Sequence, residues 1–280
     1  MSESRPVVVV SPRGAPRPII VEVPHAGLGI PPEVAAELAL DEAGIKRDAD
    51  LYVHELYARA PELGATLIYT EISRFVVDLN RADDDVDAAA VVGLPHPRPH
   101  SPRGLVWRVA TDGTPVLKAP LSLASYQTRI ARYHAPYHLA LDQAVAEQRA
   151  RFGRVLVLSG HSMPSQGKAT HADPGKRRAD VVPGDLRGQS CAPNVTAAAV
   201  AHFSQAGLSV APNDPYLGGE TTRRLGQPKQ GIHALQVELN RALYMDEQTF
   251  APSEPQFSRL RGLCEELVDR LARLVEAAPP

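Results

Sequence analysis

The chain has 280 residues, 44% of them apolar and 22% charged, an ordinary composition for a globular protein with a substantial core. Thirty Lys and Arg residues nearly balance thirty-two Asp and Glu residues, and the formal net charge of -2 argues against a general nucleic-acid binder. Its two cysteines, far apart in the chain, exclude a disulfide framework and a four-cysteine zinc site, and no apolar run approaches the roughly 18 residues of a membrane span.

Short apolar runs alternate with helical patterns along the chain. In chain order we expect strands at 7–10 and 19–23, a helix at 48–63, strands at 65–69 and 75–77, a helix at 121–151, a strand at 154–158, a helix at 196–206, strands at 208–211 and 234–237, and an amphipathic helix at 256–277. This alternation predicts an α/β protein with a largely parallel sheet between helix layers.

The proline-rich stretch 91–104, which contains His96 and His100, disfavours both helix and central strand. We interpret it as a surface loop inside one domain that covers 1–280, with both histidines in solvent. The valine run near the N-terminus is too short for a secretion signal, so we expect a cytoplasmic location.

Polar side chains follow several of the predicted strands. His25 comes after the strand 19–23, His161 after 154–158 and the stretch Asp78–Arg81 after 75–77, whereas Glu238 lies at the end of 234–237. Ligands of open α/β sheets bind beyond the carboxyl ends of the strands. We therefore expect these groups to converge on one cleft.

Two histidines and a carboxylate form a plausible catalytic zinc site, in which the ion leaves one position for water and lowers the pKa of that water towards ~7. The carboxylate is expected from Asp48 or Asp50, and Glu238 can act as the proton carrier. Simpler explanations stay open: packed histidines, aspartates that cap a helix, and a solvated strand glutamate. His134 and His138, four residues apart around Pro136, are interpreted as structural residues or as supports of the site residues.

Several arginines suggest a small acidic substrate, because a guanidinium binds a carboxylate through two parallel hydrogen bonds. Arg74, Arg81 and Arg223 are candidates, although each can instead pair with aspartates such as those at 83–85. The chain has no phosphate-binding loop or dinucleotide motif, and it lacks the nucleophile turn of serine hydrolases. Nucleotide binding and serine hydrolysis therefore have no support.

The chain resembles the N-formylglutamate amidohydrolase (N-formylglutamate deformylase) family. Matching stretches include VPHAG, SRFVVDLNR, GHSMP, GGETTRRLGQP and GIHALQVELNRALYM. The resemblance implies a three-layer α/β/α sandwich with a mixed, largely parallel sheet, similar to zinc carboxypeptidases and aspartoacylases (phosphorylase/hydrolase-like). It also implies hydrolysis of N-formyl-L-glutamate to formate and L-glutamate, as in histidine degradation. Carboxypeptidases have a glutamate ligand three residues after the first histidine, where this chain has Leu28, so the carboxylate ligand must come from elsewhere.

The resemblance implies one divalent metal ion held by His25, His161 and an aspartate, with Asp50 favoured over Asp48. Zinc is the favoured ion, although cobalt, manganese and iron suit the same ligands. Glu238 would accept a proton from water and deliver it to the departing amine.

Arg74 would stabilise the oxyanion, although its spacing from the matching arginine of aspartoacylases differs by one residue. Asn80, Arg81 and Arg223 would bind the carboxylates of a small acidic N-acyl amino acid. Glu220, where family members often carry another residue, could alter the substrate accepted. The alternatives are a related zinc amidohydrolase or carboxypeptidase-like enzyme with another substrate, and a non-catalytic binder of acidic metabolites. The sequence does not indicate an oligomeric state.

Overall fold

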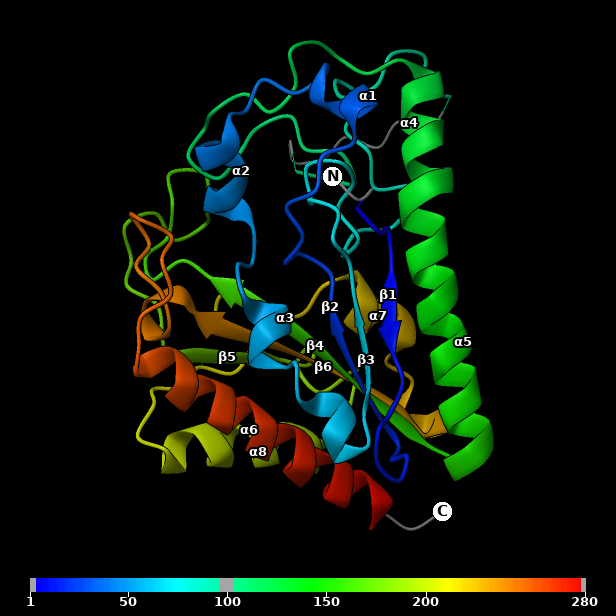
Figure 1. Ribbon diagram of the computed structural model, residues 1–280, viewed down its shortest axis with the longest axis vertical. Helices are drawn as coiled ribbons and strands as arrows, with labels where there is room; N and C mark the ends of the chain where they lie inside the picture. Colours follow the sequence, from blue (N-terminus) through cyan, green and yellow to red (C-terminus); the bar gives the residue numbers. More distant parts are fainter. Residues whose placement is uncertain (1–3, 96–102, 278–280) are drawn as a thin grey trace.

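The computed structural model describes residues 4–95 and 103–277, so His96 and His100 lie outside the described residues. Its strands are β1 (Val8–Val10), β2 (Ile19–Val23), β3 (Thr66–Tyr69), β4 (Val155–Met163), β5 (Val181–Gly184) and β6 (Ile232–Asn240) (Figure 1). Its α-helices are α1 (Pro32–Ala35), α2 (Glu42–Asp48), α3 (Val53–Leu56), α4 (Leu123–Arg129), α5 (Ala135–Phe152), α6 (Pro193–Gln205), α7 (Glu220–Leu225) and α8 (Gln256–Glu276).

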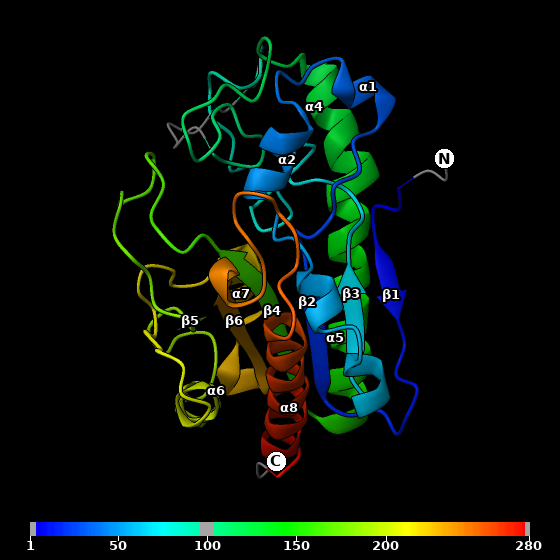
Figure 2. The same cartoon turned by 60° about the vertical axis from the view of Figure 1, so that its left-hand side comes forward.

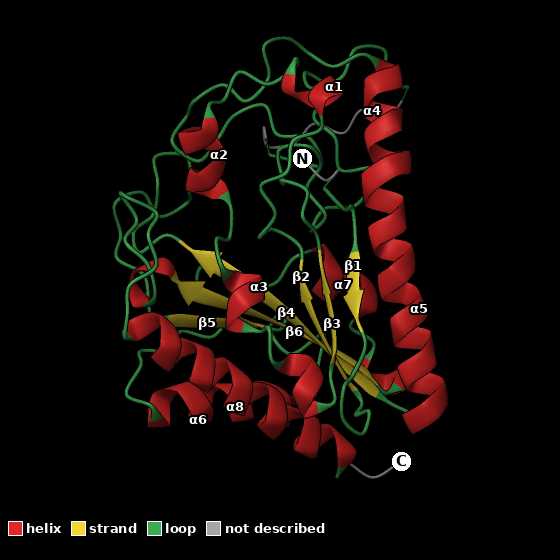
Figure 3. Cartoon of the chain, in the orientation of Figure 1, coloured by secondary structure: helices red, strands yellow, loops and turns green. Residues whose placement is uncertain are grey.

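The strands form one mixed sheet in the order β1-β3-β2-β4-β6-β5. The four central strands run parallel, and the two edge strands, β1 and β5, run antiparallel to their neighbours. The predicted α/β class with a mixed, largely parallel sheet is therefore confirmed. The carboxyl ends of the parallel strands point towards the loop-rich part of the molecule that carries α1 and α2 (Figure 3).

Each face of the sheet has its own apolar core because successive strand residues point to opposite sides. On one side Ile19, Val21 and Leu156 pack in a cluster with residues of α3, α6 and α8. On the other side Ile20 and Val157 pack with residues of α4 and α5. Helices therefore cover both faces, which is the predicted three-layer arrangement (Figure 2). No helix among the described residues has the length and apolar character needed to cross a membrane.

The helix predicted over 48–63 is wrong, and the break has a local cause. Helix α2 ends at Asp48, Ala49 is extended, and Tyr52 adopts a left-handed conformation with φ 64° before the short helix α3 begins. A single helical turn of the 3₁₀ type follows at Ala60–Leu63. The extended link at 49–52 turns Asp50 towards the end of β2, where its N–H donates to the His25 carbonyl (2.9 Å).

Two of the predicted strands are also wrong. Residues 75–77 are fully buried but form a turn, and the guanidinium of Arg129 donates to the carbonyl oxygens of Phe75 and Val76 (3.3 and 2.8 Å), in place of a neighbouring strand. The run 208–211 makes only a single bridge, between Val210 and Val181 at the sheet edge. The long helical pattern of 121–151 is confirmed as α4 and α5, which a π-helical turn joins before Pro136.

Candidate active site

Three chain segments bring His25, Asp50 and His161 together. His25 follows β2 after one proline, His161 lies inside β4, and Asp50 lies in the extended link between α2 and α3. All three side chains are buried. One nitrogen or oxygen atom of each lies within 4.8 Å of the other two. The predicted convergence of these residues is therefore present.

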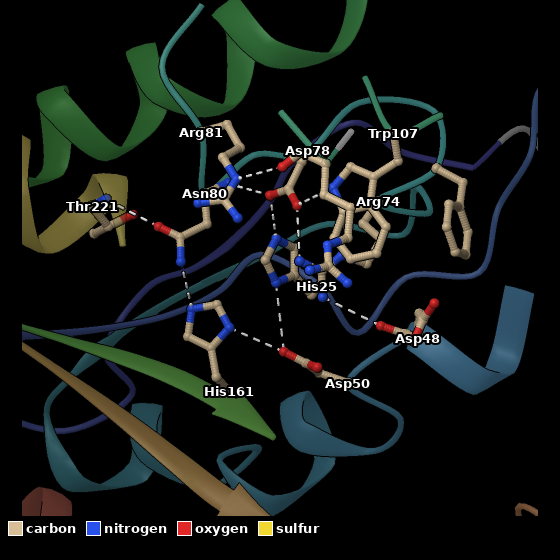
Figure 4. Close-up of polar contacts among 12 residues, drawn as sticks. His25, Asp48, Asp50, Arg74, Asp78, Asn80, Arg81, Trp107, His161 and Thr221 are labelled. Carbon is tan, nitrogen blue, oxygen red and sulfur yellow. Dashed lines mark hydrogen bonds and ion pairs between the residues drawn. The ribbon is translucent and has the colours of Figure 1, made fainter. Parts of the chain in front are cut away.

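The spacing of these atoms suits a metal ion. Oδ2 of Asp50 lies 3.0 Å from Nδ1 of His161 and 3.6 Å from Nδ1 of His25 (Figure 4). Tetrahedral zinc with bonds of about 2.0 to 2.2 Å separates its ligand atoms by roughly 3.3 to 3.6 Å. Nδ1 of His25 is buried and has no hydrogen-bond partner within the described parts of the chain. Two imidazole nitrogens and one carboxylate oxygen are a donor set that fits zinc, so the residues fit the implied ion.

Asp78 holds the ring of His25 from the other side. Its carboxylate accepts hydrogen bonds from His25 Nε2 (2.7 Å), Asn80 N (2.9 Å), Arg74 Nη2 (2.8 Å) and Trp107 Nε1 (2.9 Å). Burial opposes the charge of Asp78, but His25 and Arg74 hold the pKa of this carboxyl well below its ordinary value. An ionised Asp78 keeps the ring proton of His25 on Nε2, which leaves Nδ1 free to bind a metal.

The two candidate aspartates face different ways. Burial would raise the pKa of Asp50, but the interactions with His161 and His25 outweigh this effect and hold the pKa well below its usual range. Its second oxygen accepts from Arg241 Nη2 (3.2 Å). The carboxylate of Asp48 instead accepts from the backbone N–H (3.0 Å) and the hydroxyl of Thr111. The geometry therefore favours Asp50 as the ligand.

Glu238 lies beside His161 on the sheet and lines the same cavity as His25 and Asp50. It pairs with His161 in the register of β4 and β6, and its Oε1 accepts from Gln236 Nε2 (2.8 Å). Burial raises the pKa of Glu238, although nearby His161 opposes the shift. A buried carboxylate whose proton is more tightly held suits a group that must both take up and return a proton.

A cavity of about 190 Å³ opens above these residues. Four arginines and four carboxylates line it, namely Arg74, Arg81, Arg103, Arg241, Asp48, Asp50, Asp78 and Glu238. The guanidinium of Arg74 packs on the Trp107 ring, with Cζ 4.4 Å from the ring centroid, and its buried Nε lacks a partner among the residues that the structure describes.

The other predicted substrate residues divide into two groups. Asn80 and Arg81 line the cavity, and Asn80 is fixed by the Thr221 N–H, which donates to its Oδ1 (3.1 Å). Arg223 is not among the lining residues. Its side chain is 63% exposed and pairs with Glu220 (2.9 Å). The geometry gives no support to Arg223 as a substrate ligand, because helix α7 turns it towards solvent.

The sequence reasoning overlooked Arg241 and gave Asp78 no role. Arg241 is buried and donates to Ser162 Oγ (3.1 Å), the Arg47 carbonyl (2.6 Å) and Asp50. Both residues lie inside the stretches that carry the family resemblance, so the signal was present. Their partners are remote in the chain, and only the folded structure reveals them.

Comparisons with known proteins match this chain to one family. The family model of N-formylglutamate amidohydrolase matches residues 17–245. The N-formylglutamate deformylase of Pseudomonas aeruginosa is 33% identical over 258 residues, which cover 91% of this chain and 92% of that protein. The deformylase of Pseudomonas putida is 33% identical over 233 residues, or 82% of each chain. The crystal structure of N-formylglutamate amidohydrolase from Ralstonia eutropha has a TM-score of 0.90 and 32% identity, over 96% of this chain and 98% of that one.

Proposed function

The chain belongs to the N-formylglutamate amidohydrolase family, and on this premise we propose that it hydrolyses the formyl amide of N-formyl-L-glutamate to formate and L-glutamate, as in histidine degradation. The observation that carries the proposal is the gathering of His25, Asp50 and His161 beside Glu238 in a buried cavity rich in arginine.

The charge of the cavity supports an acidic substrate. Its four guanidinium groups balance its four carboxylates, so a divalent cation would leave an excess of about two positive charges. N-formylglutamate carries two carboxylates and matches that excess. A neutral N-acyl amino acid amide would leave the charge uncompensated in a site of low dielectric constant.

His25, Asp50 and His161 would hold the ion, for which zinc is the favoured candidate. When bound, such an ion polarises the carbonyl of the amide and makes water more acidic. Glu238 takes a proton from the attacking water and returns it to the departing nitrogen, so that glutamate leaves as an amine. Gln236 keeps the Glu238 carboxylate in place through its hydrogen bond to Oε1.

Arg74 is the residue that we expect to stabilise negative charge on the carbonyl oxygen. Its Nη2 is held by Asp78 and its guanidinium packs on the Trp107 ring, so the group is already oriented for an oxygen atom in the cavity. Arg81 and Asn80 bind the carboxylates of the amino acid. The Asn80 amide nitrogen has only two long contacts, 3.3 Å each to His161 and Gln236, which a carboxylate can replace.

The test is release of the free amino acid by the purified protein after it has been saturated with zinc, since hydrolysis of any of the N-acyl substrates frees an amino group. We expect turnover of N-formyl-L-glutamate that a chelator abolishes and zinc restores. N-formyl-L-aspartate and N-acetyl-L-glutamate serve as alternative substrates. The first tests selectivity for the amino acid, and the second tests selectivity for the acyl group. Faster turnover of either analogue would contradict the substrate, and zinc-loaded protein that turns over none of the three would contradict the enzyme.

A further inference from the structure

A chain of buried polar side chains lies beneath the proposed metal centre, on the side of the sheet covered by α5. Glu22 of β2 and Ser159 of β4 are partners in the strand register, and His161 follows two residues later on the same face. Tyr137 reaches the same place from α5. Glu22, Ser159 and Tyr137 are each 0% exposed.

Both oxygens of the Glu22 carboxylate accept a hydrogen bond from a hydroxyl group. Ser159 Oγ bonds to Oε1, and Tyr137 OH bonds to Oε2 (2.5 Å). Burial, followed by the charge of Glu22, raises the pKa of Tyr137 well above its ordinary value, so this hydroxyl stays protonated and donates. An acidic residue in the middle of a sheet costs free energy unless it has such donors. The proposed reaction gives Glu22 no direct part, and its place therefore needs another explanation.

The donor and acceptor of each hydrogen bond among these side chains follow from the ring of His161. Nδ1 of this ring faces Asp50 (3.0 Å), and a metal ligand must present a lone pair, so the ring proton must sit on Nε2. Two groups contact Nε2: Ser159 Oγ at 3.1 Å and Asn80 Nδ2 at 3.3 Å. The Thr221 N–H bonds to Asn80 Oδ1 and so turns the amide NH₂ towards His161.

Asn80 therefore cannot accept the proton of His161, whereas Ser159 can. The Ser159 hydroxyl accepts a hydrogen bond from Nε2 of His161 and donates a hydrogen bond to the Glu22 carboxylate. The two histidines are then held alike, His25 by Asp78 directly (2.7 Å) and His161 by Glu22 through one serine. Partners of this kind fix the orientation of a ligating ring and raise its basicity.

We propose that Ser159 and Glu22 are positioning residues of the metal centre, which fix His161 with Nδ1 towards the ion. This inference rests on the metal centre of the proposed function. It assigns a role to a buried acid that neither binds the ion nor touches the substrate cavity.

The experiment measures zinc affinity by competition with a chromogenic chelator, for the full-length wild-type protein, Ser159→Ala, Glu22→Gln and the double variant. Ser159→Ala is expected to weaken zinc binding about 10- to 100-fold. Glu22→Gln keeps the shape but offers a weaker, neutral acceptor, and it should weaken binding less. The double variant should bind zinc as Ser159→Ala does, because Glu22 acts only through the serine.

Ser190→Ala is the matched control. Ser190 is equally buried and its hydroxyl donates to the Ala234 carbonyl (2.8 Å), but it does not contact the metal ligands. A purely structural role for Ser159 would lower the unfolding midpoint of both serine variants and leave zinc affinity unchanged in both, and that result would overturn the inference. Additive losses in the double variant would also overturn it. Wild-type protein that binds no zinc would instead remove the metal centre itself. If Glu22→Gln does not fold, the two serine variants still decide.

Discussion

Replacing Asp78 by asparagine tests how the site prepares His25 for a metal. The carboxylate accepts four hydrogen bonds, two on each oxygen: His25 and Asn80 on Oδ1, and Arg74 and Trp107 on Oδ2. Whichever way the new amide turns, its NH₂ faces two donors. Hydrogen bonds to a charged group contribute about 1.5–3 kcal/mol each, so losing two lowers the free energy of unfolding by ~3–6 kcal/mol.

Metal affinity should fall at the same time. Without an ionised acceptor on Nε2 the ring of His25 is no longer held in the tautomer that leaves Nδ1 unprotonated, and zinc binding should weaken about 10- to 100-fold. Urea unfolding of the metal-free protein measures the first effect, and chelator competition at low temperature measures the second. Asp185→Asn is the control, since Asp185 is also buried and accepts from Thr196 (2.6 Å) away from the cavity.

The two variants separate stability from metal binding. Both should lose stability, but only Asp78→Asn should lose zinc affinity. Equal zinc affinity in the wild-type protein and Asp78→Asn would refute the idea that Asp78 prepares His25. An unfolding free energy of Asp78→Asn within about 1 kcal/mol of the wild-type value would refute the contribution assigned to the four hydrogen bonds of Asp78.

Three further predictions concern the ligands, the base and acid stability. Asp50→Asn should abolish stoichiometric zinc binding and Asp48→Asn should retain it, as measured by metal analysis after dialysis; the reverse result would exchange their assignments. Glu238→Gln should lower kcat about 10²–10⁴-fold in steady-state kinetics with zinc still bound, and near-normal turnover would exclude Glu238 as the proton carrier. Burial, aided by His134 and Arg224, lowers the pKa of His138 to about 3. In the unfolded chain this histidine has its ordinary pKa of ~6.5 and is protonated first as the pH is lowered. The free energy of unfolding should therefore decrease by up to ~1.4 kcal/mol for each pH unit below about pH 6.5. His138→Gln should flatten that slope in urea unfolding at pH 5 and 7, and an unchanged slope would count against the prediction.

The central strands and the long helices were predictable because each is encoded locally. The run 154–158 is apolar throughout, as a strand buried on both faces requires, and it forms the start of β4. The leucines of 256–277 recur at helical spacing and form α8. The apolar run 75–77 also has the local pattern of a strand, but it does not form one. Arg129, more than fifty residues away in the chain, supplies the hydrogen bonds that replace a partner strand.

The amino-acid sequence alone determined which residue types lie at or near the carboxyl ends of the parallel strands, and hence that His25, His161 and Glu238 meet at one edge of the sheet. Strand direction suffices for that, since all carboxyl ends of parallel strands share one side. Only the tertiary structure shows how the surroundings of Asp48 and Asp50 differ, because they depend on the left-handed turn at Tyr52 and on where Thr111 and Arg241 lie. The tertiary structure also shows that the Arg223 side chain is exposed to solvent and that Arg241 is buried. The direction of a side chain at a helix or strand end depends on neighbours that are remote in sequence.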